Sequence, residues 1–510
     1  MLSLEWQNLK SGSDIRGTAT EGEYNQPLEL TNKVVEKISK AFIKFLTKKM
    51  GKSAVGLTIS VGHDSRLSAA VIKECVFKAV LKCGTNIYDC GLSSTPAMFT
   101  TTIEEPLCDG AMMITASHLP YNKNGFKFFT ANGSLESEEI EEILQYAMDE
   151  NFPADAVKQG ELKVLELMPR YSKKLVKFIR EKTNEEKPLS GLKIVVDAGN
   201  GAGGFFVEKV LWPLGADTSG SQFLIPDGRF SNHVPNPENK EAMESVCNAV
   251  KENKADFGVI FDTDVDRAGA VFASGREINR NVLIALISKI LLDERKGAYI
   301  VTDSITSDGL TKFIEERGGF HHRYKRGYKN VINEAIKLNG QGKYCPLAIE
   351  TSGHAAFREN HFLDDGAYVI VRLLIKLSFL KKEGKLLENE ILGLKMPKEE
   401  VEIRLGFNTE DFKEYGKELL EELERFCAAD PVYNVPKVNH EGVRASFDED
   451  NGDGWFLLRM SLHDPIMPLN IESNTKGGNI VIAKKLFEVL SKYNKLNLSN
   501  LEKFIKEKLI

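Results

Sequence analysis

The sequence predicts an α/β protein, with three related mixed-sheet α/β domains followed by a smaller C-terminal α+β domain. Three segments share one plan, in which an apolar β-branched run leads into a polar or glycine-rich turn and then into a helical stretch. This alternation is typical of sheets covered by helices. The chain has 510 residues, whereas single cores stop growing near 250–300 residues, so about three or four domains are expected.

The three repeats place their turns where chemistry is expected. The apolar runs cover residues 57–61, 193–197 and 299–303. A helix is predicted over about 68–82 after the first run, a second helix carries Phe205, Val207 and Val210, and a third ends near 318–319. Ligands of such sheets bind at the carboxyl ends of the strands, so the polar turns are the candidate sites.

The C-terminal region follows a different pattern. Strands are predicted at 401–405 and 455–461, helices near 409–427 and 478–493, and a surface helix after Asn500. We therefore predict domains at 1–160, 161–278, 279–395 and 396–510.

Composition excludes several classes of protein. The net charge is −6, and no long basic stripe occurs, so neither nucleic acid nor an acidic membrane surface is an expected partner. No apolar stretch approaches the ~20 residues that span a bilayer, and residues 1–6 do not read as a signal peptide. Seven cysteines without CxxC spacing indicate reduced thiols. The expected compartment is the cytoplasm, and the sequence gives no oligomeric state.

Two polar segments complement each other chemically. Residues 113–120 offer Ser117 in a turn, and residues 262–267 offer Asp262, Asp264 and Asp266 beside Arg267. Alternate carboxylates can turn toward one hard cation, and Mg²⁺ favours such oxygens together with phosphate oxygens. We therefore predict a phosphorylated Ser117 that faces a magnesium site.

Simpler explanations exist for each motif. A serine and a histidine in a loop usually make local hydrogen bonds, and adjacent residues form a poor nucleophile–base pair. The aspartate run also fits a solvated turn or a calcium loop, although a calcium loop requires glycine where Arg267 stands. Gly199, Gly201 and Gly204 satisfy GxGxxG, but a tight strand–helix turn explains them better than a dinucleotide site.

Taken together, the turns resemble those of the α-D-phosphohexomutases, the phosphoglucomutase and phosphomannomutase superfamily. The resemblance extends along nearly the whole chain and is carried by four motifs in the expected order. These are the phosphoserine loop 115–120 with 122–127, the metal loop 262–267, the sugar-binding loop 350–354 and the phosphate-binding loop 459–465. The segments 13–17 and 62–66 also fit.

The resemblance implies a reaction. The phosphoserine would give its phosphoryl group to a hexose phosphate, and the bound 1,6-bisphosphate would turn over and return its other phosphate to the serine. The phosphate thereby moves between C1 and C6. The implied cofactors are Mg²⁺ and glucose 1,6-bisphosphate, and the implied substrates are small hexose phosphates, with glucose and mannose first.

The resemblance also assigns roles to single residues. Proton transfer would fall to Lys127 and Lys329, while His354 would either transfer a proton or orient its loop. Ser117 would join the three aspartates around the metal. Substrate contacts are implied for a larger set: Arg16, Arg267, Glu350, Ser352, Arg459, Ser461 and His463.

Two motifs depart from the common pattern. Leu462 and His463 stand where the phosphate loop usually has a small residue and a threonine, so an imidazole replaces a hydroxyl donor. Thr263 and Val265 stand where the metal loop commonly has glycines, although side chains between the ligands can point away.

Other functions are left open by the sequence. Asp262-Thr263-Asp264-Val265 also resembles the nucleophile motif of haloacid-dehalogenase-like phosphatases, which would leave the other three loops unexplained. A phosphoglucosamine mutase, or a paralogue that binds sugar phosphates without turnover, also remains possible. The choice of hexose is not predicted.

Overall fold

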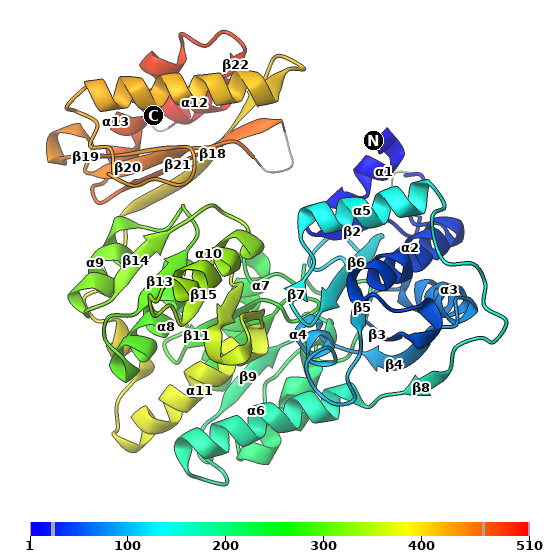
Figure 1. The fold of residues 1–510 in the computed structure, drawn as a ribbon. Coiled ribbons are helices and arrows are strands. Elements are labelled where there is room, and N and C mark those ends of the chain that lie inside the picture. Colours follow the sequence, from blue (N-terminus) through cyan, green and yellow to red (C-terminus); the bar gives the residue numbers. More distant parts are fainter. Residues whose placement is uncertain (1, 22–25, 462–464, 508–510) are drawn as a thin grey trace. The chain divides into compact units, whose positions relative to one another are not determined.

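The computed structural model describes residues 2–21, 26–461 and 465–507 (Figure 1). The chain divides into two compact units. Unit 1 comprises residues 1–290 and 346–392, and unit 2 comprises 291–345 and 393–510. No helix in the described ranges combines the length and the apolar character needed to cross a membrane.

The first sheet of unit 1 is mixed, as the sequence predicts. Its strand order is β1-β2-β6-β5-β3-β4-β8, and β7 pairs with β6. The strands β3, β4, β5 and β8 run parallel, whereas β6 is antiparallel to both β5 and β2. The bounds are β1 Lys10–Ser11, β2 Asp14–Thr18, β3 Thr58–His63, β4 Asn86–Leu92, β5 Gly110–Ile114, β6 Lys123–Thr130, β7 Gly133–Ser134 and β8 Leu162–Val164.

Helices cover both faces of this sheet. The side chains of Phe128 and Phe129 on β6 point to opposite faces, as alternation along a strand requires. Phe128 packs against Phe42 of α2, and Phe129 packs against Phe99 of α4. The helices are α2 Asn32–Met50, α3 Ala69–Lys82, α4 Thr95–Thr100 and α5 Ser137–Met148, after a short α1 Leu4–Asn8. The helix predicted over 68–82 is thereby confirmed as α3.

The second sheet of unit 1 has the order β12-β11-β10-β9, with β9 and β10 parallel and β11 antiparallel to β10. Ile260 of β10 belongs to the core beneath α7, while its neighbour Phe261 packs against Phe206 on the other side. The bounds are β9 Ile194–Asp197, β10 Phe257–Phe261, β11 Ala268–Phe272, β12 Glu277–Ile278, α6 Leu167–Thr183, α7 Lys240–Asn253 and α8 Arg280–Glu294.

The helix predicted around 205–210 is present, but it is not a regular α-helix. It consists of a 3₁₀ turn at Ala202–Gly204, a π-helical turn at Val207–Leu211 and a 3₁₀ turn at Trp212–Leu214. Pro213 has no backbone N–H to donate to an α-helical ladder, so a regular helix could not continue through it.

Residues 346–392 complete unit 1. The strands β15 Leu347–Ile349, β16 Ala355–Phe357 and β17 Leu363–Asp364 pair antiparallel in that order, and α11 Gly366–Lys382 follows. The α11 helix packs against α6 and β11. The turn between β15 and β16 is therefore held close to the end of the second sheet.

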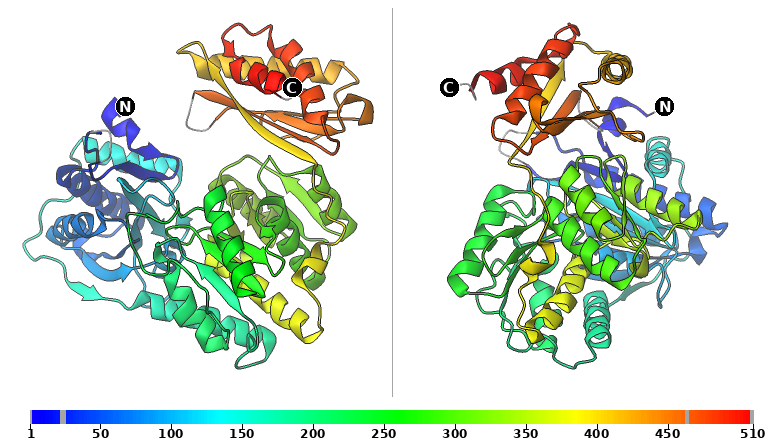
Figure 2. Two further views of the ribbon diagram at one scale, coloured as in Figure 1. Left: turned by 180° about the vertical axis from the view of Figure 1, so that it is seen from behind. Right: turned by 90° about the vertical axis from the view of Figure 1, so that its left-hand side faces the viewer.

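Unit 2 contains two parts. In the first, β13 Tyr299–Thr302 pairs parallel with β14 Phe320–Arg323, accompanied by α9 Asp308–Glu316 and α10 Tyr328–Gly340. The second is the C-terminal sheet of order β19-β20-β21-β18-β22, and α12, α13 and α14 lie on one of its faces (Figures 1 and 2). Its bounds are β18 Glu399–Phe407, β19 Val443–Phe447, β20 Gly454–Leu458, β21 Ile466–Ser473, β22 Leu496–Asn497, α12 Phe412–Ala429, α13 Gly478–Leu490 and α14 Ser499–Glu507.

The predicted α+β character of the C-terminal region is confirmed. The strand predicted over 455–461 ends at Leu458, because Arg459, Met460 and Ser461 leave the sheet to begin the connection to β21. The helix expected after Asn500 is present as α14.

Candidate active site

The candidate phosphoserine lies in the loop that connects β5 to β6. Ser117 is 3% exposed and adopts a left-handed backbone with φ +49°. Its hydroxyl donates to Asp262 Oδ2 at 3.0 Å and accepts from Arg267 Nη2 at 3.1 Å. The structure thus brings together the two segments that the sequence paired, and a left-handed non-glycine residue at such a position is a typical sign of function.

Arg66 holds this loop in place. Its Nη1 donates to the carbonyls of Pro120 and Lys123 at 2.8 Å each, and its Nη2 donates to Leu119 at 2.7 Å and also to Ser117. One guanidinium therefore satisfies four loop carbonyls, which a lysine with three donors could not do.

Asp64 connects Arg66 to the start of the same loop. Its Oδ1 accepts from the backbone N–H of Arg66 at 2.9 Å, and its Oδ2 accepts from the Thr115 hydroxyl at 2.7 Å. Burial raises the pKa of Asp64 to about 6, against the opposing charge of Arg66. Asp64 and Arg66 belong to the 62–66 turn that fits the family pattern, and their roles become visible only from these contacts.

The aspartate loop follows β10. Asp262, Asp264 and Asp266 are at most 3% exposed, and one carboxylate oxygen of each lies within 4.8 Å of the others. Asp264 Oδ1 and Asp266 Oδ1 are buried without a hydrogen-bond donor. Buried, unpartnered carboxylate oxygens fit a hard cation such as Mg²⁺, which would supply the missing positive charge.

The pKa shifts of Asp262 and Asp266 are consistent with a bound cation. Burial, followed by the charges of Asp266 and Asp264, raises the pKa of Asp262 well above its usual range. Burial opposes ionisation of Asp266 as well, but Lys127, His354 and Arg267 together lower its pKa. Lys127 and Arg267 supply two positive charges to three adjacent carboxylates, and a bound cation would favour ionisation of all three.

Val265 is one of the two residues that stand where the metal loop commonly has glycine. It is fully buried and adopts φ +66°, a conformation that β-branched residues rarely take. Its carbonyl accepts from the Gly366 backbone at 3.1 Å, which helps to hold the turn. The valine therefore occupies a position whose backbone favours glycine, so the loop keeps its shape at some cost in strain.

Lys127 lies on β6 beside the aspartates. Its Nζ is 3.1 Å from Asp264 Oδ2 and forms an ion pair with Asp266. Thr95, at the start of α4, also donates to Asp264 Oδ2 at 2.5 Å and was not identified from the sequence. Arg16 of β2 pairs with Asp14 at 2.8 Å. Burial lowers the pKa of Arg16, but Asp14, and then Asp264 and Asp266, raise it by more.

His118 is not positioned as a general base for its neighbour. Its Nδ1 accepts from Arg267 Nη2 at 2.5 Å and lies 3.4 Å from the Ser117 hydroxyl. Burial and the charge of Arg267 lower the pKa of His118 to about 2, so the ring is neutral and acts as an acceptor. This agrees with the expectation that adjacent residues make a poor catalytic pair.

The sugar-loop residues lie in the turn between β15 and β16. Gly353 closes the turn at φ +94°, where its N–H donates to the Glu350 carbonyl at 3.1 Å. Ser352 Oγ is 2.8 Å from His354 Nδ1, and Glu350 Oε2 is 3.7 Å from that nitrogen. An isolated bridge pairs His354 with Arg267, so the sugar loop and the metal loop meet within unit 1.

The remaining predicted residues belong to unit 2. Lys329 lies in the first turn of α10 and is half-buried. Arg459 is 6% exposed, and burial lowers its pKa. The backbone N–H of Ser461 donates to Ile466 at 3.0 Å, which holds the ends of the connection between β20 and β21. His463 lies outside the described residues, so its role stays a prediction.

Comparisons with known proteins match this arrangement of domains. Three family descriptions match, phosphoglucomutase/phosphomannomutase alpha/beta/alpha domain I over residues 7–154, domain II over 169–275 and domain III over 279–392. The domain boundaries proposed from the sequence lie near these limits and remain a proposal.

Similar proteins cover most of the chain. A phosphomannomutase/phosphoglucomutase from Pseudomonas putida is 32% identical over 419 residues, covering 82% of this chain and 84% of that protein. A phosphoglucomutase from Neisseria gonorrhoeae is 30% identical over 420 residues, covering 82% and 85%. The crystal structure of a phosphoglucomutase/phosphomannomutase family protein from Burkholderia thailandensis superposes with a TM-score of 0.77 at 25% identity, covering 97% and 98% of the two chains. The chain therefore belongs to the phosphoglucomutase/phosphomannomutase family of the α-D-phosphohexomutase superfamily.

Proposed function

We propose that this enzyme interconverts hexose 1-phosphate and hexose 6-phosphate through a phosphorylated Ser117 and a hexose 1,6-bisphosphate. One observation carries the proposal: the Ser117 hydroxyl lies between Asp262 Oδ2 and Arg267 Nη2, at 3.0 and 3.1 Å, beside two further buried aspartates. Phosphoryl transfer depends mainly on positioning and on stabilising charge, and this arrangement supplies both. The names of the relatives favour glucose and mannose phosphates as substrates.

Each half-reaction moves one phosphoryl group between Ser117 and the sugar. A sugar hydroxyl forms a new bond to the phosphorus as the bond from phosphorus to Ser117 Oγ breaks, and the hydroxyl proton passes to a basic group on the enzyme. After the bisphosphate reorients, the second step runs in reverse at the other phosphate. Mg²⁺ held by Asp262, Asp264 and Asp266 would stabilise the charge on the transferring group.

The protein supplies the proton and charge-stabilising groups. Lys127 is held by Asp264 and Asp266, so as a charged donor it would stabilise the departing seryl oxygen. Burial lowers the pKa of His354 to about 3, so its ring is a neutral, weak base, and we assign it the orientation of the sugar loop, where its Nδ1 is 2.8 Å from the Ser352 hydroxyl. Lys329 remains a second candidate for proton transfer.

Binding roles follow the chemistry of the side chains. Glu350 and Ser352 would hold sugar hydroxyls, since both accept hydrogen bonds and serine also donates. The guanidiniums would hold phosphate oxygens. We assign the distal phosphate to Arg459, Ser461 and His463, and the transferring group to Arg267 and Arg16. Glucose 1,6-bisphosphate as activator and a cytoplasmic location complete the proposal.

The test is a coupled assay of the purified protein with glucose 1-phosphate, Mg²⁺ and catalytic glucose 1,6-bisphosphate. Formation of glucose 6-phosphate, dependent on the bisphosphate, is expected. Inorganic phosphate without isomerisation would instead indicate a phosphatase, and no turnover with any hexose phosphate would indicate a binding paralogue. Replacing the substrate with mannose 1-phosphate and with glucosamine 1-phosphate distinguishes the mutase proposed here from a phosphoglucosamine mutase.

A further inference from the structure

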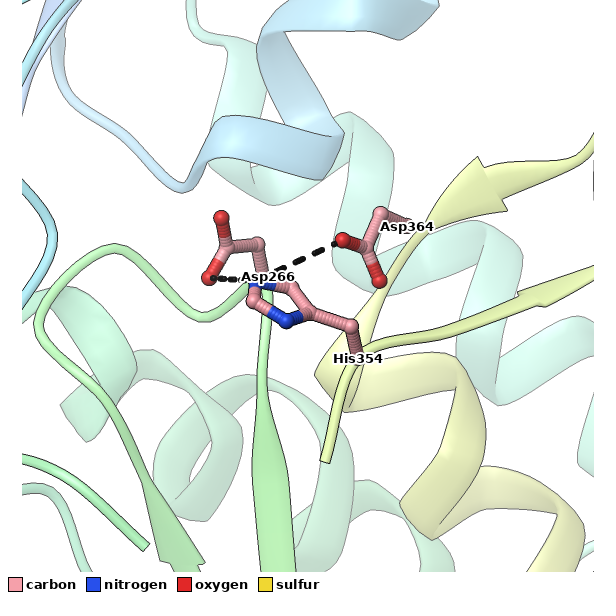
Figure 3. A group of neighbouring side chains, drawn as sticks. All are labelled: Asp266, His354 and Asp364. Carbon is pink, nitrogen blue, oxygen red and sulfur yellow. Dashed lines mark ion pairs between the residues drawn. The ribbon is translucent and has the colours of Figure 1, made fainter. Parts of the chain in front are cut away.

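A second cluster of metal-ligand side chains lies next to the aspartate loop and shares one residue with it. Asp266 precedes β11, His354 precedes β16 and Asp364 ends β17, and one ligand atom of each lies within 4.8 Å of the others (Figure 3). Two of these residues, His354 and Asp364, are not part of the aspartate triad.

Asp364 has no hydrogen-bond partner for its charge. The residue is 8% exposed, and neither of its carboxylate oxygens receives a hydrogen bond. Asp266 Oδ1 also receives no hydrogen bond, because the Lys127 ammonium donates to the other oxygen, Asp266 Oδ2. Buried carboxylate oxygens without donors are costly, so a positively charged group at this position would remove an unfavourable feature.

The distances distinguish an ion from a direct hydrogen bond. His354 Nε2 lies 3.6 Å from Asp364 Oδ2 and 3.8 Å from Asp266 Oδ1. Both separations exceed the ~2.7–3.2 Å of a hydrogen bond to nitrogen. Around a tetrahedral zinc ion, with bonds of about 2.0–2.1 Å, ligand atoms are separated by roughly 3.4 Å. A contraction of a few tenths of an ångström would bring His354 Nε2 to that separation from both carboxylates, and the two carboxylate oxygens, which lie within 4.8 Å of each other, would close on the same ion.

The contact of the other ring nitrogen of His354 is consistent with metal binding at Nε2. His354 Nδ1 is 2.8 Å from the Ser352 hydroxyl. When Nδ1 donates to that oxygen, the lone pair of Nε2 faces the two carboxylates, an unfavourable contact unless a cation lies between them. A metal-bound histidine typically donates its second N–H to such a partner.

Lys127 and Arg267 do not supply a hydrogen bond to the Asp364 carboxylate. Lys127 hydrogen-bonds to Asp264 and pairs with Asp266 Oδ2, and Arg267 Nε is 3.2 Å from Asp262 but 3.8 Å from Asp266 Oδ1. The charge of Asp266 is therefore partly compensated by both cations. Neither cation donates a hydrogen bond to Asp364, which Lys127 influences through its charge and which the imidazole of His354 approaches at 3.6 Å.

We propose that Asp266, His354 and Asp364 form a second divalent-cation site, which takes an ion of the Zn²⁺ or Co²⁺ class in preference to Mg²⁺. An imidazole with two carboxylates suits these ions, whereas Mg²⁺ favours an all-oxygen octahedron. Asp266 would bridge the two sites through its separate oxygens.

Equilibrium dialysis against Zn²⁺, without substrate, tests the proposal. The Asp264→Asn protein is used because it weakens the triad and leaves all three proposed ligands unchanged. It is expected to bind one Zn²⁺. Adding Asp364→Asn or His354→Gln to it should weaken that binding by at least ~10–100-fold, the range found even for groups outside the ligand sphere.

The control is His361→Asn in the same background, which removes an exposed neighbouring imidazole at a left-handed position that asparagine tolerates. It should leave Zn²⁺ binding unchanged. Equal Zn²⁺ binding by the Asp364 and His354 variants would refute the site, as would loss of binding in the His361 variant alone.

A second measurement does not depend on folding of the variants. Crystals of the wild-type protein soaked in Zn²⁺ with excess Mg²⁺ should show anomalous scattering from zinc about 2.0–2.1 Å from His354 Nε2. Zinc found only among the three aspartates, or not bound at all, would overturn the proposal. Neither measurement uses turnover, so its failure is separate from failure of the proposed mutase activity.

Discussion

At the residue scale, the Ser117 hydroxyl lies between the Asp262 carboxylate and the Arg267 guanidinium. Removing this oxygen leaves the phosphoryl group without an acceptor. We expect Ser117→Ala to lower kcat by at least ~10³-fold, since residues that form covalent intermediates are not replaced by their neighbours. The melting temperature should be nearly unchanged.

Steady-state assay and intact-mass spectrometry measure this prediction. The wild-type protein should carry one phosphate at Ser117 and the variant none. Ser274→Ala, which alters an exposed serine between β11 and β12, is the matched control. Phosphate found only at other positions in active enzyme would contradict the assignment.

Arg66 gives a second prediction, because its guanidinium holds four carbonyls of the phosphoserine loop. Arg66→Lys keeps the positive charge beside Asp64 but loses at least one of these bonds and the planar geometry. We expect kcat to fall by ~10–100-fold, equivalent to one or two hydrogen bonds to a charged group, with a smaller change in KM.

Arg404→Lys is the control, since Arg404 is exposed on β18 and is not assigned to the candidate site. A merely structural role for Arg66 would lower the melting temperature without changing kcat per folded molecule. Equal kcat values for wild type and Arg66→Lys would therefore refute the positioning role.

At the scale of elements, the loop between β10 and β11 concentrates negative charge in a buried turn. Asp264→Asn removes one charge while preserving shape. We expect weaker Mg²⁺ activation, with the half-saturating concentration raised by at least ~10-fold, and little loss of stability, because repulsion among the carboxylates also falls. Activity against Mg²⁺ concentration is the measurement, with the exposed Asp450→Asn as control. A normal Mg²⁺ dependence would show that the triad is not the metal site.

The turn after β9 contains a buried ion pair that should respond to pH. His233 Nε2 is 3.0 Å from Asp197 Oδ2. Burial lowers the pKa of His233, but Asp197 raises it by more, so the net effect is a raised pKa. The pair is therefore fully stabilising below the unfolded value of about 6.5 and loses that stabilisation as pH rises through the folded pKa.

The prediction is that His233→Asn lowers the melting temperature more at pH 6 than at pH 9. For a protein of this size the difference should be no more than ~2–4 °C. Scanning calorimetry of both proteins at the two pH values measures it. A penalty that is equal at both values, or larger at pH 9, would show that the charged pair is not stabilising.

At the scale of the whole molecule, the sequence predicted which residues form the candidate site better than which residues contact them. Small polar residues in a turn indicated Ser117, and alternate carboxylates after the apolar run at 257–261 indicated the aspartates, whereas the sugar loop was identified only through its resemblance to the family motif. The hydrophobic pattern also predicted α3, α9 and the C-terminal sheet, since each buries a periodic apolar face.

What the sequence could not predict depends on contacts between distant residues. Arg66 and Thr95 bind residues more than fifty positions away, and Asp364 lies close to Asp266 although the two are far apart in the sequence. The turn that carries Arg66 matched the family pattern, but no local pattern indicated which atoms these three side chains would meet. The left-handed backbone of Val265 was also missed, because a β-branched residue gives no local signal of it. The mixed character of the sheets was predicted, whereas the pairing of β6 with both β5 and β2 joins strands far apart in the sequence and has no local signal.

The most direct test of the central claim follows the phosphoryl group itself. Enzyme labelled with ³²P at Ser117 is mixed with unlabelled glucose 1-phosphate and Mg²⁺, and the products are separated after rapid quenching. We expect the label to leave the protein, to appear first in glucose 1,6-bisphosphate and to be in glucose 6-phosphate once the turnover is complete. Label that stays on the protein while glucose 6-phosphate forms, or that leaves as inorganic phosphate, would contradict phosphoryl transfer between Ser117 and the sugar.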